Sequence, residues 1–516
     1  MTKSYFLQFF FFAFVSAFVH PGLLVNEVDI SRIQTKLASK QDPWLSSWNK
    51  LISIKYASPS YTNNAVPIVY RGDDGVHPAN AEKLWHDAAA AFNLALRWKV
   101  DKDVECAEAA SKIMVAWGKT LTAFGNSDEN YLAAGFQGHQ LANAAELLRD
   151  YSPFAENGLS VVIEMLKNVF LSKNIFFLNH QAPSEHNHKH FHANWELGNI
   201  ASAMAIGVLS DNQTAFDYAV DYFKNGSGNG AINNAITNIV SEPGTGKPLG
   251  QGQESGRDQG HSALNQQMLG VIAQQAWNQG EDLYSYNNSR LLLGAEYFAR
   301  YNLGNDVPFE PWTNNIVSWT EISSASRGAT RPTWELLYSH YGQIKGLDVP
   351  WTKQFFNYTL GTFGGVFEGG GGSYGEGSGH YDGLGWGTLL YRLDQSDVDA
   401  TRSSSSSTIV ASTSTVSTPS STSIVVAASA SAFSTFSTSS YTASVTVKPT
   451  SVVHISTGYI PTSQEPVVKP TTFSTLIRSA TAIPIPEMLP SSTSTAQNAM
   501  TSVIPTEGED DSCESD

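Results

Sequence analysis

Apolar residues recur three and four positions apart through most of the chain between residues 25 and 395, and short breaks rich in Gly, Asn, Asp and Pro separate the segments. This spacing places the apolar side chains on one face of a helix. Alternating strand patterns are hard to find, so the sequence predicts an all-α fold. The clearest helical stripes span residues 84–98, 104–117, 141–148, 159–170, 197–208 and 264–276, with further helices near 290–301 and 333–342.

A series of amphipathic helices without a sheet can form a bundle, a solenoid or a closed ring of helical hairpins. We find no fixed-period sequence repeat of the kind that a solenoid shows. We therefore expect an (α/α) toroid, in which loops at the helix ends converge on a central cleft.

The N-terminal segment MTKSYFLQFFFFAFVSA has a lysine, an apolar core and small residues at Ser16 and Ala17. This pattern predicts a secretory signal peptide over residues 1–17. A signal anchor is the alternative, but it needs ~20 apolar residues to span a bilayer, and the run from Tyr5 to Val19 is too short. We expect no membrane span elsewhere.

The chain from residue 399 to 516 is rich in Ser, Thr, Val, Ala and Pro, as in STSTVSTPSSTS, and has no helical or strand period. Such a composition predicts a disordered, O-glycosylated tail, which is suited to association with a cell wall. The expected organisation is a signal peptide (1–17), a helical domain (18–398) and this tail. Export is also favoured by four N-x-S/T glycosylation patterns, at Asn212, Asn225, Asn287 and Asn357.

The formal net charge is -16, which disfavours general binding of nucleic acid. An acidic polysaccharide would therefore need a locally basic cleft, which we expect Arg257, Arg331 and the histidines to line. The two cysteines, Cys106 and Cys513, indicate a core that needs no disulfide.

Acidic, basic and imidazole side chains are concentrated in GQGQESGRDQGHSALNQQ, residues 250–267. In a helix, acids at this spacing would orient the guanidinium and the imidazole on one face. The glycines weaken a helix, so a loop that leads into a helix near Ser262 is an alternative, and a solvated, salt-bridged helix start is another. The four residues at i, i+3, i+4 and i+7 are Glu254, Arg257, Asp258 and His261.

A second polar segment, NHQAPSEHNHKHFHANWELGNIAS, has histidines at positions 186, 188, 190 and 192. On a strand they would share a face and suit a structural metal. In a polar loop they would instead supply imidazole donors beside Asn194 at a helix start, an arrangement suited to holding a carboxylate. A solvent-exposed loop is the third interpretation. We expect no metal or other cofactor.

A third group lies in RPTWELLYSHYG, where Arg331, Glu335 and Tyr338 fall at i, i+4 and i+7. Tyr338 offers a phenol for proton transfer, although an ordinary half-buried aromatic is the alternative. Tyr297 and Tyr301 are rivals for the same role.

The ordered set of NHKHFHANWELGNIAS, GQGQESGRDQGHSALNQQ and EYFARYNLGNDVPF resembles the alginate lyase superfamily of polysaccharide lyases over about residues 60–395. The resemblance implies an (α/α) toroid and β-elimination of a uronic-acid polysaccharide, without a metal. The chain has HANWE where the best-studied alginate lyases carry an Asn-His pair, so it resembles a side branch. Alginate, polymannuronate and glucuronan are the candidate substrates.

β-Elimination requires a group that neutralises the uronate carboxylate, a base for the C5 proton and an acid for the departing O4. We expect Asn194 and Arg257 to neutralise the carboxylate, His261 to be or to activate the base, and Tyr338 to be the acid, close to Arg331. The carry-over from the family supports Asn194 and His261 best. The residues expected to bind substrate are His190, His192, Trp195, Glu254 and Tyr301.

Two other functions are consistent with the sequence. A glycoside hydrolase on a helical toroid would use two carboxylates, and it would leave saturated chain ends where elimination leaves a C4–C5 double bond. A non-catalytic, wall-associated carbohydrate-binding protein would bind polyuronate without shortening it. The carboxylates open to a hydrolase are Glu254, Asp258, Glu376 and Asp382.

Overall fold

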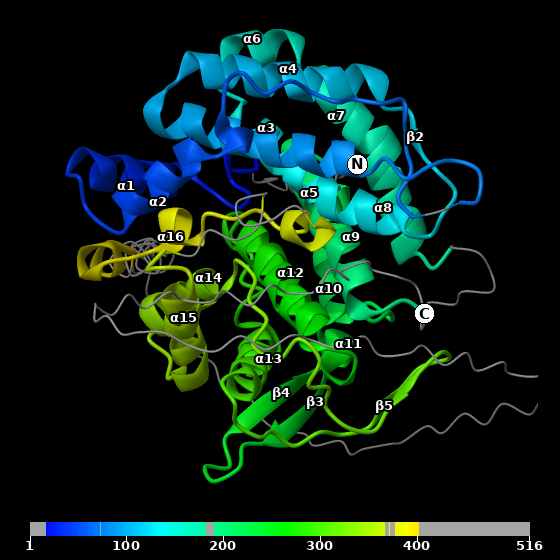
Figure 1. Ribbon diagram of the computed structural model, residues 1–516, viewed down its shortest axis with the longest axis vertical. Helices are drawn as coiled ribbons and strands as arrows, with labels where there is room; N and C mark the ends of the chain where they lie inside the picture. The colour runs from blue at the N-terminus through cyan, green and yellow to red at the C-terminus, as the bar shows by residue number, and fades with distance from the viewer. Residues whose placement is uncertain (1–16, 73, 182–189, 367–370, 372–376, 402–516) are drawn as a thin grey trace, which may run out of the picture. The chain divides into compact units, whose positions relative to one another are not determined.

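The computed structural model describes residues 17–401, apart from residue 73 and the segments 182–189, 367–370 and 372–376. Figure 1 shows that helices dominate this part of the chain. The helices that build the inner layer of the fold are α3 (Glu82–Asp101), α5 (Asn130–Leu147), α9 (Ala193–Leu209), α12 (Gln259–Trp277) and α14 (Trp334–Tyr338).

The helices outside this layer pair with the inner ones in hairpins, such as α3 with α4, α9 with α10 and α13 with α12. They are α4 (Val104–Thr120), α6 (Ser152–Asn157), α7 (Leu159–Met165), η2 (Leu166–Leu171), α8 (Ser172–Leu178), α10 (Gln213–Asn225), α13 (Tyr286–Asn302), η4 (Ser339–Ile344) and α15 (Pro350–Thr362). The remaining ones are α1 (Glu27–Ala38), α2 (Trp44–Ser53), η1 (Lys55–Ala57), α11 (Ile232–Ala235), η3 (Gln253–Gly256), η5 (Ser378–Tyr381) and α16 (Gly387–Tyr391).

The contacts between helices form a closed circuit. Helix α3 packs on α5, α5 on α9, α9 on α12 and α12 on α13, while α13 leads through α15 to α14. Helix α14 then packs on α16, α16 on α1 and α1 on α3. The expected all-α class and the (α/α) toroid are therefore confirmed.

The inner helices run in the same direction, as residue pairs along α5 and α9 show. A Cβ added at Gly135 would lie 2.7 Å from the carbonyl carbon of Gly198, and one at Gly138 would lie 2.1 Å from the Ser202 hydroxyl. Because partners advance together along both helices, α5 and α9 are parallel. Helices α12 and α14 are parallel for the same reason. Gly270 of α12 faces Thr333 at the start of α14, and the ring of Trp277, seven residues later, contacts that of His340, directly after α14.

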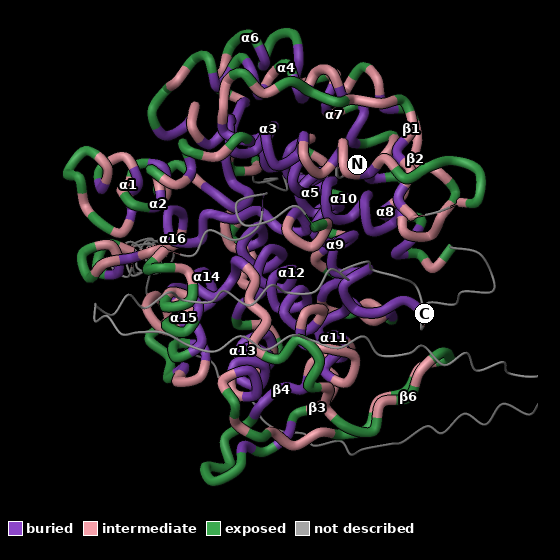
Figure 2. Tube along the Cα trace, viewed as in Figure 1, coloured by how far each residue is buried: buried purple, intermediate pink, exposed green. Residues whose placement is uncertain are grey.

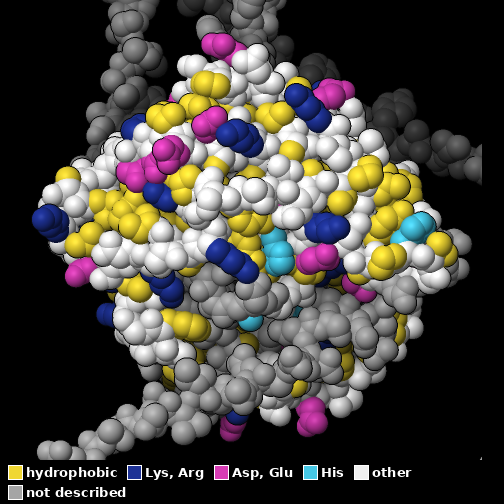
Figure 3. All heavy atoms as spheres, turned by 45° about the horizontal axis from the view of Figure 1, so that its top comes forward, with side chains coloured by type: hydrophobic (Ala, Val, Ile, Leu, Met, Phe, Trp, Pro, Cys, Tyr) yellow, Lys and Arg dark blue, Asp and Glu magenta, His cyan; other side chains and the backbone are white. Residues whose placement is uncertain are grey.

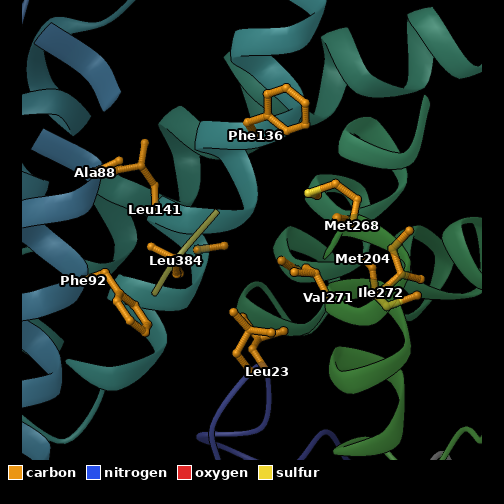
Figure 4. Close-up of a cluster of buried hydrophobic side chains, with 14 of the residues drawn as sticks. Leu23, Ala88, Phe92, Phe136, Leu141, Met204, Met268, Val271, Ile272 and Leu384 are labelled. Carbon is orange, nitrogen blue, oxygen red and sulfur yellow. The ribbon is translucent and has the colours of Figure 1, made fainter. Parts of the chain in front are cut away.

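Burial separates the two layers. All residues of α9 are buried and α5 is buried throughout, whereas α10 alternates between buried and exposed positions. Figure 2 shows the same contrast between α9 or α12 and α1. In Figure 4, Phe92 of α3, Leu141 of α5, Met204 of α9 and Met268 of α12 belong to the cluster of buried side chains. A helix buried on all sides explains why its apolar residues are not confined to one stripe.

Three short strand pairs were not expected from the sequence. Strands β1 (Ile68–Val69) and β2 (Ala123–Phe124) are parallel, whereas β3 (Ile236–Ser241) pairs with β4 (Pro248–Gly252) and β5 (Trp312–Thr313) with β6 (Ser318–Trp319) in antiparallel hairpins. The sequences ITNIVS and PLGQG of β3 and β4 lack a strict alternation of apolar and polar residues, which is why the pattern did not indicate strands.

Most of the expected signal peptide (residues 1–16) and of the tail (residues 402–516) lies outside the described residues. Immediately after the expected cleavage position, Leu23, Leu24 and Val25 are buried in the core. Cys106 is buried and unpaired, and burial raises the pKa of its thiol to about 12. No helix among the described residues combines the length and hydrophobicity that a membrane crossing requires.

Candidate active site

The charged segment of residues 250–267 is a strand, a turn and a helix start rather than one helix. Strand β4 leads into the 3-10 turn η3, and α12 begins at Gln259. Asp258 stands between them in an extended conformation (φ -168°, ψ 170°), and its side chain caps α12. The expected loop before a helix is therefore closer to the structure than a continuous helix, although the helix begins earlier than Ser262. The break still brings the four side chains together.

Glu254 is fully buried and accepts four hydrogen bonds at the start of α9. Its Oε1 accepts from the Asn194 backbone N at 3.2 Å, from Asn194 Nδ2 at 2.7 Å and from Asn265 Nδ2 at 3.1 Å. Its Oε2 accepts from Arg257 Nη1 at 3.0 Å. Burial alone would raise the pKa of Glu254, but Arg257, two histidines and the Asn194 amide hold it down at about 2. Glu254 is therefore an anion that fixes Asn194 and Arg257, not an exposed substrate contact.

Asp258 orients His261 through both carboxylate oxygens. Oδ1 accepts from the His261 backbone N at 2.7 Å, and Oδ2 lies 2.6 Å from His261 Nδ1. Burial would raise the pKa of Asp258, but the hydrogen bonds and charge of His261 lower it, so Asp258 is ionised near neutral pH. An ionised carboxylate can only accept, so Nδ1 donates and the lone pair of a neutral His261 ring is on Nε2.

Arg257 joins the two acids and remains partly open to solvent. Besides its bond to Glu254, its Nε lies 3.7 Å from Asp258 Oδ2, and its side chain is 22% exposed. The side chain of His261 is 18% exposed. Asn194, by contrast, is 1% exposed. The Asp258 side chain is 19% exposed, so Arg257, Asp258 and His261 are the members of this cluster that a substrate can reach, whereas Glu254 and Asn194 are closed to it.

His192 precedes α9 and belongs to an aromatic group beside this cluster. Its ring stacks on Trp319 at 5.3 Å and lies 6.4 Å from the ring of Trp312. Burial, with further contributions from Arg257 and His261, lowers the pKa of His192 to about 4 even though Glu254 opposes this. His192 is therefore a neutral aromatic ring near neutral pH. His190 has its ring against Phe191 at 5.0 Å.

Tyr338 is not brought to this cluster. Its ring stacks on Phe356 of α15 at 5.1 Å, and Lys353 of α15 lies 5.9 Å from the ring centre. The i, i+7 spacing from Arg331 assumed one helix, but α14 begins only at Trp334. Arg331 lies before that helix, where it donates to the Gly379 carbonyl at 2.9 Å. Arg331 and Tyr338 therefore do not share a helical face.

Trp195 and Tyr301 also have their contacts elsewhere. Trp195 is buried against Phe191 and Phe177, with ring distances of 4.9 and 6.3 Å. Tyr301 is buried beneath the guanidinium of Arg327, which lies 3.9 Å from the ring centre. Its rival Tyr297 donates to the Pro308 carbonyl, and burial raises its pKa. None of these contacts exposes a ring face for a sugar.

The described carboxylates that a hydrolase could use as its acid and base already contact arginine or histidine side chains. Glu254 and Asp258 hold Arg257 and His261, and Asp382 is buried 3.1 Å from Arg331 Nη1. Glu376 lies outside the described residues.

The described residues contain no group of three or more His, Cys, Asp or Glu side chains that could hold a metal ion. His186 and His188, half of the expected histidine set, lie outside them. On the face shown in Figure 3, basic and acidic side chains are interspersed rather than gathered by sign. The expected basic cleft is not formed by Arg257 and Arg331 alone, because a carboxylate neutralises each one.

Sequence reasoning missed Trp319 and Gly256. The side chain of Trp319 lies against the backbone of Gly256, where an added Cβ would be 2.5 Å from the Trp319 Cβ. The available signal was a pair of tryptophans that flank a short segment with two asparagines, in WTNNIVSW (residues 312–319), which is a pattern typical of a cross-strand pair.

The sequence profile of the family described as "Alginate lyase" matches residues 28–309, more than half of the chain. Strand β5 and all residues after it lie beyond that match. No curated protein matches the sequence.

Several solved structures match the chain. Alginate lyase A1-III from Sphingomonas species A1 is 15% identical, with 73% of this chain and 98% of that chain covered and a TM-score of 0.41. An alginate lyase from Bacteroides ovatus is 14% identical, with 73% and 100% covered and a TM-score of 0.43. A variant of alginate lyase A1-III complexed with a tetrasaccharide is 15% identical, with 72% and 96% covered and a TM-score of 0.45.

Proposed function

We propose that this chain, which belongs to the alginate lyase family and is therefore a polysaccharide lyase, cleaves a 4-linked uronic-acid polysaccharide by β-elimination at the cluster of Arg257 and His261. The observation that carries the proposal is the pairing of each of these residues with its own buried or half-buried acid. One pair presents a guanidinium and the other presents an imidazole with a defined tautomer. These are the neutralising group and the base that the reaction requires.

In the first step, the carboxylate of the substrate binds Arg257. The C5 proton is weakly acidic while this carboxylate keeps its full charge, so a cation close to it stabilises the charge that develops as the proton leaves. Among the residues described, Arg257 Nη2 forms no hydrogen bond to the protein. Asn194 supports this step by holding Glu254, which in turn fixes Arg257.

In the second step, Nε2 of His261 takes the proton from C5. The C5–H bond breaks, its electron pair forms the C4–C5 double bond, and the C4–O4 bond breaks. Asp258 stabilises the imidazolium that forms, because its carboxylate already accepts from Nδ1.

The imidazolium of His261 then donates the same proton to O4. A single residue reaches both positions only when the C5 hydrogen and O4 lie on one face of the sugar ring. This relation holds in 4-linked mannuronate and glucuronate and is reversed in guluronate. The proposed substrates are therefore polymannuronate, or mannuronate-rich alginate, and glucuronan.

The test is incubation of the full chain with polymannuronate, glucuronan and polyguluronate, followed by ultraviolet absorbance of the unsaturated product. We expect absorbance to rise with a polymer whose C5 hydrogen and O4 are on the same face. Equal rates on polyguluronate would refute the single-residue proton transfer. New reducing ends without absorbance would indicate hydrolysis, and binding without chain shortening would indicate a carbohydrate-binding protein.

A matched pair of histidine variants tests the assignment of the base. His261→Ala is expected to reduce turnover by about 10²–10⁴-fold, the usual effect of a general base. His20→Ala is the control. His20 is also paired with a carboxylate, but its partner is Glu146 at the C-terminal end of α5, away from the cluster of Arg257 and His261. Turnover by His261→Ala at the level of His20→Ala would contradict the assignment.

We also propose that the protein is secreted and that its Ser/Thr-rich tail associates with the cell wall. Support comes from the segment of residues 1–17 and from the composition of residues 399–516. N-terminal sequencing of protein from the culture medium is expected to begin at Phe18. A mature chain that begins at Met1 and stays with the cells would contradict the proposal.

A further inference from the structure

The β5–β6 hairpin presents two tryptophans on one face. Trp312 and Trp319 are directly opposite each other in the antiparallel pair, next to the pair of Thr313 and Ser318. Their rings stack at 5.0 Å with an angle of 23°. Side chains alternate between the faces of a hairpin, so the tryptophans lie on one face and the two hydroxyl residues on the other.

These tryptophans do not serve the hydrophobic core. Within the described part of the chain, neither belongs to the buried apolar clusters nor packs against them. Both are partly exposed. No described residue accepts a hydrogen bond from either indole N–H. Two large aromatic side chains that are held at the surface without a core to fill are typical of a binding surface.

The hairpin is attached to the segment that carries Glu254 and Arg257. Gln251 of β4 exchanges two hydrogen bonds with the backbone of Glu310, each 2.8 Å long, at the base of the hairpin. Trp319 then lies against Gly256, the residue before Arg257, at a distance that leaves no room for a side chain. The position of the tryptophans is therefore coupled to that of Arg257.

We propose that Trp312 and Trp319, packed against the buried ring of His192, form a platform that binds a pyranose ring of the polysaccharide next to the ring held by Arg257. The identification of that ring as a uronate rests on the proposed function. Indole rings take the apolar C–H face of a sugar, and their N–H groups donate to its hydroxyls. His192 extends the stack as a neutral ring, two residues before Asn194.

A platform of this kind contributes affinity that does not depend on ionic strength. The attraction between Arg257 and a uronate carboxylate is screened by salt, whereas contact between an indole and a sugar face is apolar and is not weakened by it. Measurements at two salt concentrations can therefore distinguish the contribution of Arg257 to affinity from that of the tryptophans.

The experiment measures KM and kcat on oligomers of the cleaved uronate, at about 0.05 and about 0.5 M NaCl, conditions that differ several-fold in screening length. Trp312→Ala is expected to raise KM about tenfold at both salt concentrations, which corresponds to about 1.4 kcal/mol, and to change kcat less than twofold. The control is Trp98→Ala. Trp98 is also partly exposed, but it lies near the C-terminal end of α3, where it donates to Asp150.

A KM for Trp312→Ala within twofold of that of Trp98→Ala would overturn the platform. A fall in kcat at unchanged KM would also overturn it, because it would assign the hairpin to positioning Arg257 rather than to binding sugar.

A binding measurement separates this proposal from the proposed reaction. Tryptophan emission is titrated with the oligomer in His261→Ala and in the double variant with Trp312→Ala. A change in emission that is lost in the double variant supports the platform even if the wild-type chain forms no unsaturated product. Elimination by the wild type, with emission changes equal in both variants, would leave the lyase proposal intact and refute the platform.

Discussion

Asp258→Asn separates the two tasks of Asp258, because asparagine keeps one of them. As the N-cap of α12, Asp258 accepts from the His261 backbone N, and asparagine is as good a helix cap as aspartate. As the partner of His261 Nδ1, it supplies a negative charge that asparagine lacks. The variant should therefore fold with nearly unchanged stability and lose activity.

The magnitude follows from the 2.6 Å contact between Asp258 Oδ2 and His261 Nδ1. A hydrogen bond to a charged group contributes about 1.5–3 kcal/mol, and each 1.36 kcal/mol is tenfold in rate. Loss of the charge alone then reduces kcat about 10- to 150-fold. The Asn amide can also donate to Nδ1, which favours the tautomer with its proton on Nε2 and blocks that atom as a base. Together the two effects give a reduction on the order of 10²–10⁴-fold.

The assay follows formation of the unsaturated product, with urea unfolding measured in parallel. Asp103→Asn is the control, because Asp103 also caps a helix, α4, through bonds to Glu105 N and Cys106 N. We expect this variant to keep wild-type turnover. If Asp258→Asn retained kcat within about threefold of Asp103→Asn, far less than a lost charged hydrogen bond predicts, His261 would not be the base that Asp258 orients.

Two further outcomes are expected. Burial lowers the pKa of His192 from 6.5 to about 4, so the unfolded chain binds a proton that the native chain does not between these values, and stability falls as the pH falls through this window. His192→Phe keeps an aromatic ring beside Trp319 but cannot bind this proton. When the pH is lowered from 7 to 4.5, its free energy of unfolding in urea should fall by about 2–3 kcal/mol less than that of the wild type. An equal fall in both proteins would contradict the burial of a neutral His192. Gly256→Ala places a Cβ 2.5 Å from that of Trp319 and should raise KM about as much as the tenfold, 1.4 kcal/mol effect of removing Trp312. Gly361→Ala is the control, because nothing lies within 4 Å of the added Cβ, and it should leave KM unchanged. Equal KM values for Gly256→Ala and Gly361→Ala would show that the hairpin does not depend on Gly256.

The helices were predictable where one face meets the core. The stripes at 84–98 and 104–117 correspond to α3 and α4, because helix periodicity and burial coincide there. The β3–β4 hairpin was missed because its residues are fixed by packing rather than by alternation. An added Cβ at Gly250 of β4 would lie 2.6 Å from the Ile236 side chain and 2.9 Å from the Gly294 backbone N of α13. Such a contact depends on residues far apart in the sequence.

The site was predictable in composition but not in role. Glu254, Arg257, Asp258 and His261 do come together, but the break at Asp258 sends one acid to the start of α9 and the other to the start of α12. A single helix would have aligned all four side chains along one surface. Tyr338 was misplaced for the same reason, since helical spacing was extended across the start of α14.

The charges at the site explain why apolar contacts are needed beside it. Glu254 and Asp258 are both ionised near neutral pH, and Arg257 is the guanidinium beside them. In the state in which His261 acts as a base its ring is neutral, so Arg257 then balances only one of the two acids and the cluster carries a net negative charge. That charge favours the imidazolium when His261 takes a proton, which promotes the proposed reaction. It does not attract a polyanion over a distance. Affinity for the polymer must therefore come from short-range contacts, and the tryptophans of the β5–β6 hairpin supply a surface of that kind next to Arg257.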